Sequence, residues 1–238
     1  MSPFEWTIAI VAVTAGACAQ GAIGFGLGLL AAPILAILDP DLVPGPLLLA
    51  ASALTVMVAI RERGQLDLQG VKWAVIGRIP GSAVGALAVA TLPHDALLVV
   101  FAVLVLAAVA LSVGGWRVEP APTTLFAAGA TSGLMGSITS IGGPPMAIVY
   151  QHRSGPELRA TLALYFVFGS LLSVGLLTAV GEMGLSDVGA GLLLMPPVVG
   201  GFVASRSLAR WLDSGLLRPV LLAFSACAAV LVLVLEFA

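Results

Sequence analysis

Two glycine- and proline-rich segments of the chain contain the residue types that could bind an ion. They read GAIGFGLGLLAAP, from Gly21 to Pro33, and GLMGSITSIGGPP, from Gly133 to Pro145. Each segment interrupts an apolar run, and glycine followed by proline is the combination with which a helix stops and restarts. A helix that breaks at membrane depth exposes backbone groups that must meet protein, water or a ligand. Paired breaks of this kind predict the binding site of a transporter.

The helix that follows each break is expected to begin near the middle of the bilayer. In the second segment the expected first helical residue is Pro144, and from there to His152 a helix rises about 14 Å, half of a bilayer. In the first segment the helix is expected to restart between Gly26 and Gly28. Each helix start carries about half a positive charge. Two converging starts therefore predict an anion site that has no basic side chain at its centre.

Polar side chains beside the breaks could complete the shell around the anion, and Ser132 is one further hydroxyl within reach. The irregular backbone before Pro144 is expected to include Ser137, Thr139 and Ser140. The candidate substrate-binding residues are Gln20, Gly24, Phe25, Gly26, Gly28, Ser137, Thr139, Ser140, Gly142, Gly143 and Pro144.

Four further residues, Arg78, Tyr150, Gln151 and Arg153, lie where the chain is expected to reach the cytoplasm. Arg78 stands a turn or two inside its helix, and a buried ionisable group in a membrane is a functional candidate. Because it is near a helix end, the favoured interpretation is that its side chain reaches the lipid headgroups. The alternative is that these residues line a cytoplasmic vestibule for anions. His152 is interpreted as a solvated loop residue rather than a proton carrier.

Residues for several other chemistries are missing from the sequence. No Asp or Glu stands in the middle of an apolar segment, so a carboxylate proton relay or sodium site has no support. There is no GxxxxGK[ST] phosphate-binding loop, and ATP hydrolysis by this chain is not expected. Cys18 and Cys227 stand alone in apolar segments and are interpreted as packed side chains. No catalytic residue, metal site or cofactor is predicted.

The composition is that of an integral membrane protein. Of the 238 residues, 60% are hydrophobic and 9% are charged, and the mean hydropathy is +1.12. Soluble domains carry about 25% charged residues. The N-terminal sequence MSPFEW has no basic region or cleavage motif, so no removable signal peptide is expected. The net charge of −2 gives no reason to expect nucleic-acid binding.

The distribution of Lys and Arg predicts the topology. The polar gaps at 39–46, 91–96 and 181–187 contain no Lys or Arg, and the positive-inside rule places them outside the cell. Both ends of the second broken stretch, near Arg117 and Arg153, are then cytoplasmic, which requires a hairpin. Single spans are expected around Ala51, Val84, Val105, Ser170, Val198 and Ala226, and hairpins at 3–38 and 124–150.

This arrangement predicts an all-α integral membrane protein built from two inverted repeats. Residues 1–118 form the first repeat and residues 119–238 the second, and together they make one transporter domain. Each repeat contains a glycine-broken, re-entrant helical hairpin followed by three transmembrane helices. An odd number of crossings in each repeat inverts the second relative to the first.

The glycine-broken motif near the start of each half, with GxxG…GGPP in the second, resembles the sulfite exporter TauE/SafE family of membrane transporters. The resemblance implies secondary transport of small anions such as sulfite, sulfonates or related sulfur-containing organic acids, often outward, across the inner membrane of a bacterium. Leu30 and Ala31 stand where the second motif has Gly142 and Gly143, so the first break is expected to be milder. The residues that match the family's motifs are Gly21, Gly24, Gly26, Gly28, Pro33, Gly133, Gly136, Gly142, Gly143, Pro144 and Pro145.

The residues leave three other functions open. An anion channel would share this composition, and only flux kinetics would separate it from a carrier that works by alternating access. A membrane assembly subunit would explain the composition but not the two breaks. An intramembrane serine protease is suggested by Thr131-Ser132-Gly133, although a serine nucleophile needs a histidine close by. His94 and His152, the two histidines, are expected at the membrane surfaces.

Glycine also serves a simpler purpose in membrane helices, since it lets two backbones approach closely. Gly81, Gly85, Gly200 and Gly201 are interpreted as such helix contacts. The expected partners are a small anionic substrate and the lipid bilayer, while a coupling ion and a homo-oligomer stay open.

Overall fold

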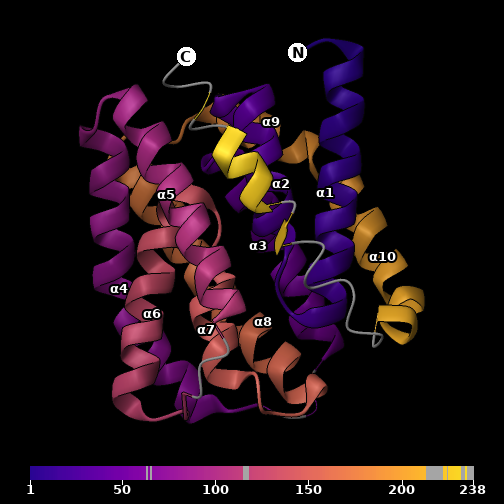
Figure 1. The fold of residues 1–238 in the computed structure, drawn as a ribbon, viewed down its shortest axis with the longest axis vertical. Helices are drawn as coiled ribbons and strands as arrows, with labels where there is room; N and C mark the ends of the chain where they lie inside the picture. Colours follow the sequence, from indigo (N-terminus) through magenta and orange to yellow (C-terminus); the bar gives the residue numbers. More distant parts are fainter. Residues whose placement is uncertain are drawn as a thin grey trace.

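The computed structural model describes residues 1–62, 64, 66–114, 118–212, 222–223, 225–231 and 234. Every regular element in these ranges is helical (Figure 1), so the prediction of an all-α protein is confirmed. The elements are α1 (Pro3–Ile23), α2 (Leu27–Leu38), the short 3-10 helix η1 (Pro40–Leu42), α3 (Gly45–Arg61), α4 (Leu68–Thr91), α5 (His94–Val113), α6 (Pro122–Thr139), α7 (Gly143–Tyr150), α8 (Gly155–Ala179), α9 (Leu185–Leu193) and α10 (Met195–Leu212).

Six helical segments of the described chain are long and apolar enough to cross a membrane, so this is a multi-pass membrane protein. They lie at Pro3–Ile23, Pro40–Arg61, Leu68–Thr91, His94–Val113, Gly155–Ala179 and Leu185–Ser207. The last segment combines α9 and α10, which separate at Leu194 because Pro196 and Pro197 cannot donate the next helical hydrogen bonds. The span expected around Ala226 is described only in part, and Arg117 lies outside the described residues.

The first predicted break separates α1 from α2. Gly24 ends α1 in the left-handed conformation, with φ 94°, and its N–H donates to the Gln20 carbonyl at 2.8 Å. Gly26 has φ 142°, a second conformation that side chains disfavour. The Leu27 N–H, at the start of α2, donates to Oε1 of Gln20 at 3.2 Å. The predicted restart of the helix at this point is confirmed.

The second break separates α6 from α7 and is shorter than the sequence predicts. The prediction of irregular backbone at Ser137 and Thr139 is wrong, because α6 continues through both. The next residue, Ser140, caps the helix in the left-handed conformation, with φ 59°. α7 begins at Gly143, one residue earlier than expected. In each hairpin the first helix is the longer one. The first helices, α1 and α6, have 21 and 18 residues, whereas the second helices, α2 and α7, have 12 and 8.

Glycines allow two pairs of long helices to pack with their backbones in contact. α4 packs along α6, and α1 packs along α10. A Cβ atom on Gly81 would overlap a backbone carbonyl of α6, and one on Gly201 would overlap a carbonyl of α1. The interpretation of Gly81, Gly85 and Gly201 as helix contacts is therefore confirmed. It is wrong for Gly200, because nothing lies within 4 Å of its Cβ position.

Replacing Gly81 with alanine is expected to lower the stability of the fold, because α4 and α6 must move apart to accept one methyl group. Overpacking of this kind costs about 1–3 kcal/mol. Gly200→Ala, in α10, is the matched control, since it makes the same helix-favouring change where the space is open. Thermal unfolding of the detergent-purified variants measures the difference. Equal melting temperatures for the two variants would contradict the close packing.

Candidate functional site

The tips of the two hairpins meet inside the protein. A Cβ atom on Gly28, in the first turn of α2, would overlap the carbonyl oxygen of Ser140 at the second tip. A Cβ atom on Gly143, in the first turn of α7, would lie 2.7 Å from Cβ of Phe25 at the first tip. The starts of α2 and α7 therefore converge on one place, as the sequence predicts.

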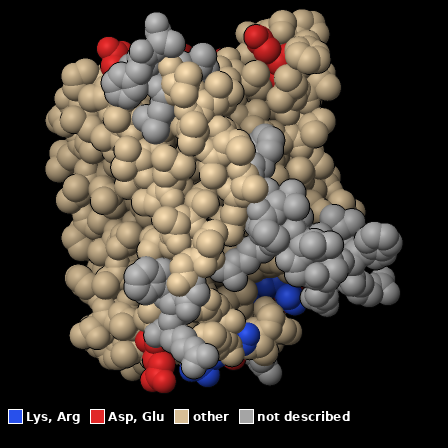
Figure 2. Space-filling view, viewed as in Figure 1, with Lys and Arg blue, Asp and Glu red and all other residues tan. Residues whose placement is uncertain are grey.

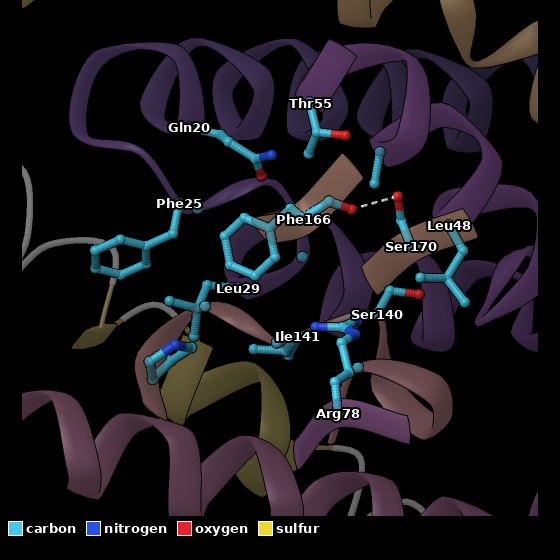
Figure 3. Close-up of a pocket in the computed structure, with 17 residues that line it drawn as sticks. Gln20, Phe25, Leu29, Leu48, Thr55, Arg78, Ser140, Ile141, Phe166 and Ser170 are labelled. Carbon is cyan, nitrogen blue, oxygen red and sulfur yellow. Dashed lines mark hydrogen bonds between the residues drawn. The ribbon is translucent and has the colours of Figure 1, made fainter. Parts of the chain in front are cut away.

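A cavity of about 40 Å³ lies where the tips meet (Figure 3). Residues of both breaks line it, together with side chains of α3, α4 and α8. It has room for a few water molecules, since one water needs about 10–15 Å³. Of the residues singled out from the sequence, the cavity is lined by Gln20, Phe25, Gly26, Gly28, Arg78, Ser140, Gly142, Gly143 and Pro144.

Arg78 is buried beside this cavity, and the expectation that its side chain reaches the headgroups is wrong. Its exposed fraction is 2%. α4 begins at Leu68, so Arg78 lies ten residues and about 15 Å into the helix rather than a turn or two. Figure 3 shows its guanidinium beside Ser140 and Ile141, across the cavity from Gln20 and Thr55.

The Arg78 guanidinium is held by neutral groups. Nη1 donates to the Ser132 hydroxyl at 3.0 Å and to the Tyr165 hydroxyl at 3.1 Å, and the group stacks 5.2 Å from the centre of the Tyr165 ring. Nε is buried and has no hydrogen-bond partner within the described structure. The ion pairs found among the described residues do not include Arg78. The site is therefore a buried positive charge with unused hydrogen-bonding capacity.

Glycines make the space that this large side chain needs. A Cβ atom on Gly169 of α8 would overlap Nε of Arg78, and one on Gly136 of α6 would lie 2.9 Å from Nη2. A Cβ atom on Gly142 would lie 3.2 Å from Nη1. The sequence gives no signal that Gly169 lies beside Arg78, because it is an isolated glycine in the middle of a long apolar helix.

The starts of α2 and α7 offer fewer free N–H groups to a bound anion than the sequence suggests. Pro144 and Pro145 occupy the first turn of α7 and provide no N–H groups, so the electropositive helix end acts there mainly through its dipole. At α2 the N–H of Leu27 is already paired with the Gln20 amide. The charge of Arg78 therefore dominates the electrostatics of the cavity.

Six of the candidate substrate-binding and vestibule residues lie outside the cavity. Ser137 donates to the Ser173 hydroxyl at 2.9 Å, and Thr139 donates to the Met135 carbonyl at 2.7 Å. Gly24 packs against Arg159 of α8. The remaining three lie at or beyond the end of α7: Tyr150 donates to Asp67 at 2.8 Å, Gln151 is in the following turn, and Arg153 pairs with Glu157 at 3.8 Å.

Residues from α3 and α8 complete the wall of the cavity. Thr55 and Ser170 add hydroxyl groups, and Leu48 and Phe166 add apolar surface. Their sequence neighbourhoods carry no signal of a site, because each is an ordinary residue of an apolar helix. Only the packing of α3 and α8 around the hairpin tips reveals them.

The Ser132 hydroxyl links Arg78 to the second hairpin tip. Its hydroxyl accepts the hydrogen bond from Arg78 and donates to the Gly142 carbonyl at 2.5 Å. A serine nucleophile needs a base as its hydrogen-bond acceptor, whereas here the acceptor is a backbone carbonyl of the second tip. The geometry therefore gives the protease interpretation no support.

The chain is similar to one known protein family over nearly its whole length. Residues 8–232 match the family described as Sulfite exporter TauE/SafE. This range includes both helix breaks and every residue that lines the cavity. No curated protein and no solved structure matches the chain. A family match of this extent identifies a membrane transporter, and the chain belongs to the sulfite exporter TauE/SafE family.

Proposed function

We propose that the protein is a secondary transporter that binds one small anion, such as sulfite, a sulfonate or a related sulfur-containing acid, in the cavity between the hairpin tips. It exports this anion across the inner membrane of a bacterium. The observation that carries the proposal is Arg78, which is buried, lines the cavity and lacks an acidic partner in the described structure.

The electrostatics of the site favour an anionic ligand. A buried charge without a counter-ion is costly, and an anion in the cavity would offset that cost. A guanidinium also presents several N–H groups in a plane, which suits the oxygen atoms of an oxyanion. The starts of α2 and α7 line the same cavity and add positive potential to it. The hydroxyls of Thr55, Ser140 and Ser170 also line it, but each donates its proton to a backbone carbonyl, so the favourable charge comes from Arg78 and the helix starts.

The packing of the helices supports alternating access by two inverted repeats, 1–118 and 119–238. If α1 corresponds to α6 and α4 corresponds to α9 and α10, the contact of α4 with α6 has its counterpart in the contact of α10 with α1. Likewise α5 packs on the short helix α7, and Ser225, from the last helical segment, donates to the Leu29 carbonyl of the short helix α2. Two related halves that share a central site can rock around it.

A counterflow experiment in proteoliposomes tests this function. Vesicles loaded with unlabelled sulfite are expected to take up labelled sulfite faster than empty vesicles do, and the rate should saturate with concentration. Sulfate, an alkylsulfonate and a carboxylate, each offered as competitor, then rank the anions. Uptake that never saturates and shows no counterflow would favour the channel, and no anion-dependent flux at all would contradict transport.

A further inference from the structure

The arginine-bearing end of the protein contains a cluster of three charged side chains that joins the two halves of the chain. Nε of Arg159 lies 3.3 Å from Oε1 of Glu62, and Nε of Arg61 lies 3.1 Å from the same oxygen. Nη2 of Arg159 also donates to Oε2 of Glu62 at 3.5 Å. The three side chains are only 15–23% exposed, so water weakens these ion pairs less than it weakens a surface pair.

The cluster fastens four helices at one point. Arg61, at the end of α3, donates to the Gly21 carbonyl of α1 and to the Ser205 hydroxyl of α10 at 2.8 Å. Its guanidinium also lies 4.8 Å from the centre of the Phe202 ring of α10. Arg159, in the first turns of α8, donates to the Ala22 carbonyl at 3.5 Å. Both arginines therefore meet the electronegative end of α1, where positive charge is favourable.

The same cluster supports the wall of the anion cavity. The Cβ position of Gly24 lies 3.4 Å from Cα and from Cγ of Arg159, so the first hairpin tip rests on this side chain. The next two residues of that tip, Phe25 and Gly26, line the cavity. Movement of Arg159 away from Glu62 would therefore free the tip on this side.

Both ends of the protein have a large cavity. The one at the arginine-bearing end, of about 670 Å³, is lined by Gly64, Leu66, Asp67, Arg153 and Glu157 and includes no member of the cluster. The one at the opposite end, of about 610 Å³, is lined by Trp6, His94, Phe101 and the acidic residues Asp39, Asp41, Glu182 and Asp187, among others. In Figure 2 the visible Lys and Arg side chains lie at the lower end, whereas acidic side chains occur at both ends. The positive-inside rule makes the lower, arginine-bearing end cytoplasmic.

In the described part of the chain, one polar contact links the wall of the small cavity to the wall of the large cavity at the opposite end. The Ser140 hydroxyl, which lines the small cavity, donates at 3.1 Å to the carbonyl of Pro44, which lines the large one. One neutral hydrogen bond contributes about 1 kcal/mol, less than the several ion pairs and hydrogen bonds at the other end. Among the described residues, the polar contacts that hold the first hairpin tip at the arginine-bearing end thus outnumber those between the two cavity walls on the outer side.

From this contrast we infer that Glu62 and Arg159 form the cytoplasmic gate of the anion cavity, and that separating them is the step that opens the cavity to the cytoplasm. The inference rests on the proposed transport function, because a gate serves transport. Its test concerns access to the cavity and needs no substrate. Arg61 is the positioning residue that keeps Glu62 in place and ties it to α1 and α10.

Accessibility of a cysteine in the cavity tests the gate. Ala51→Cys, which places a thiol in the cavity wall, is made in a protein with Cys18→Ala and Cys227→Ala. A membrane-impermeant maleimide is then applied to inside-out and to right-side-out vesicles. The thiol is expected to react slowly from the cytoplasmic side. Glu62→Gln and Arg159→Gln should each raise that rate by about tenfold, which corresponds to the loss of about 1.4 kcal/mol of contacts that keep the gate closed.

Glu157→Gln is the matched control, because it removes an acidic residue at the same end whose partner, Arg153, is outside the cluster. Its labelling rate should equal that of the parent. Rapid labelling of the parent from the cytoplasmic side, or unchanged rates in both Glu62→Gln and Arg159→Gln, would overturn the gate. The counterflow assay on the parent decides the transport function separately, so failure of one proposal does not imply failure of the other.

Discussion

Replacing Arg78 with glutamine is expected to reduce anion transport by about 100-fold or more. The variant leaves a bound anion without its buried counter-charge, and a charged group buried without its partner costs about 3–5 kcal/mol. Each 1.4 kcal/mol is a factor of ten in affinity. The initial rate of counterflow, normalised to the amount of incorporated protein, measures the loss.

Thermal unfolding separates this role of Arg78 from a purely structural one. In the absence of anion the parent must keep an unpaired cation at 2% exposure, so Arg78→Gln should melt at the same temperature as the parent or higher. Addition of the transported anion should stabilise the parent and leave the variant unchanged. Arg78→Lys keeps the charge but not the paired contacts to Ser132 and Tyr165, and it should retain part of the activity. A variant that melts early and still transports would contradict the site.

The positions of the breaks were predictable from the sequence because the requirement for glycine is local. Gly24 and Gly26 have positive φ angles, and Pro144 and Pro145 stand at the start of a helix, where their missing N–H groups cost little. These are properties of single residues and do not depend on what packs around them. The convergence of the two tips followed from the same pattern, because both breaks were expected at similar depth.

The depth of Arg78 was predicted wrongly because the start of α4 was misjudged. Placing Arg78 a turn or two inside its helix implied a helix start near Lys72, after the polar residues that follow Arg61. Instead Asp67 caps the helix, accepting the Gly70 N–H at 2.8 Å, and α4 begins at Leu68. An aspartate followed by helix-forming residues is an N-cap signal that the sequence does contain.

The remaining wall of the cavity could not be predicted from local pattern. Thr55, Phe166 and Ser170 become site residues only because α3 and α8 pack beside the hairpin tips. Gly169 matters only because the Arg78 side chain passes over it. Contacts between residues so distant in the sequence depend on the whole packing arrangement, which apolar helices of similar composition do not encode in any short motif.

Replacing Gly28 with valine is expected to abolish transport while the protein still inserts and folds. The new Cβ would overlap the Ser140 carbonyl, which is backbone and cannot rotate away, so the two hairpin tips must separate. Gly143→Val should act in the same direction through the 2.7 Å approach to Phe25. A displacement of about 1 Å in a binding site can cost 100-fold in rate.

Gly175→Val, in α8, is the control for this prediction, because the same side chain there meets open space. Counterflow rates and the amount of folded protein in the membrane are measured for all three variants. The control should match the parent in both, whereas Gly28→Val and Gly143→Val should match it only in the amount of folded protein. The contrast matters because the alternative use of glycine, close packing of helices, predicts loss of fold together with loss of activity. Transport that survives in Gly28→Val would mean that the anion passes without contact between the tips, and the cavity between them would then not be the binding site.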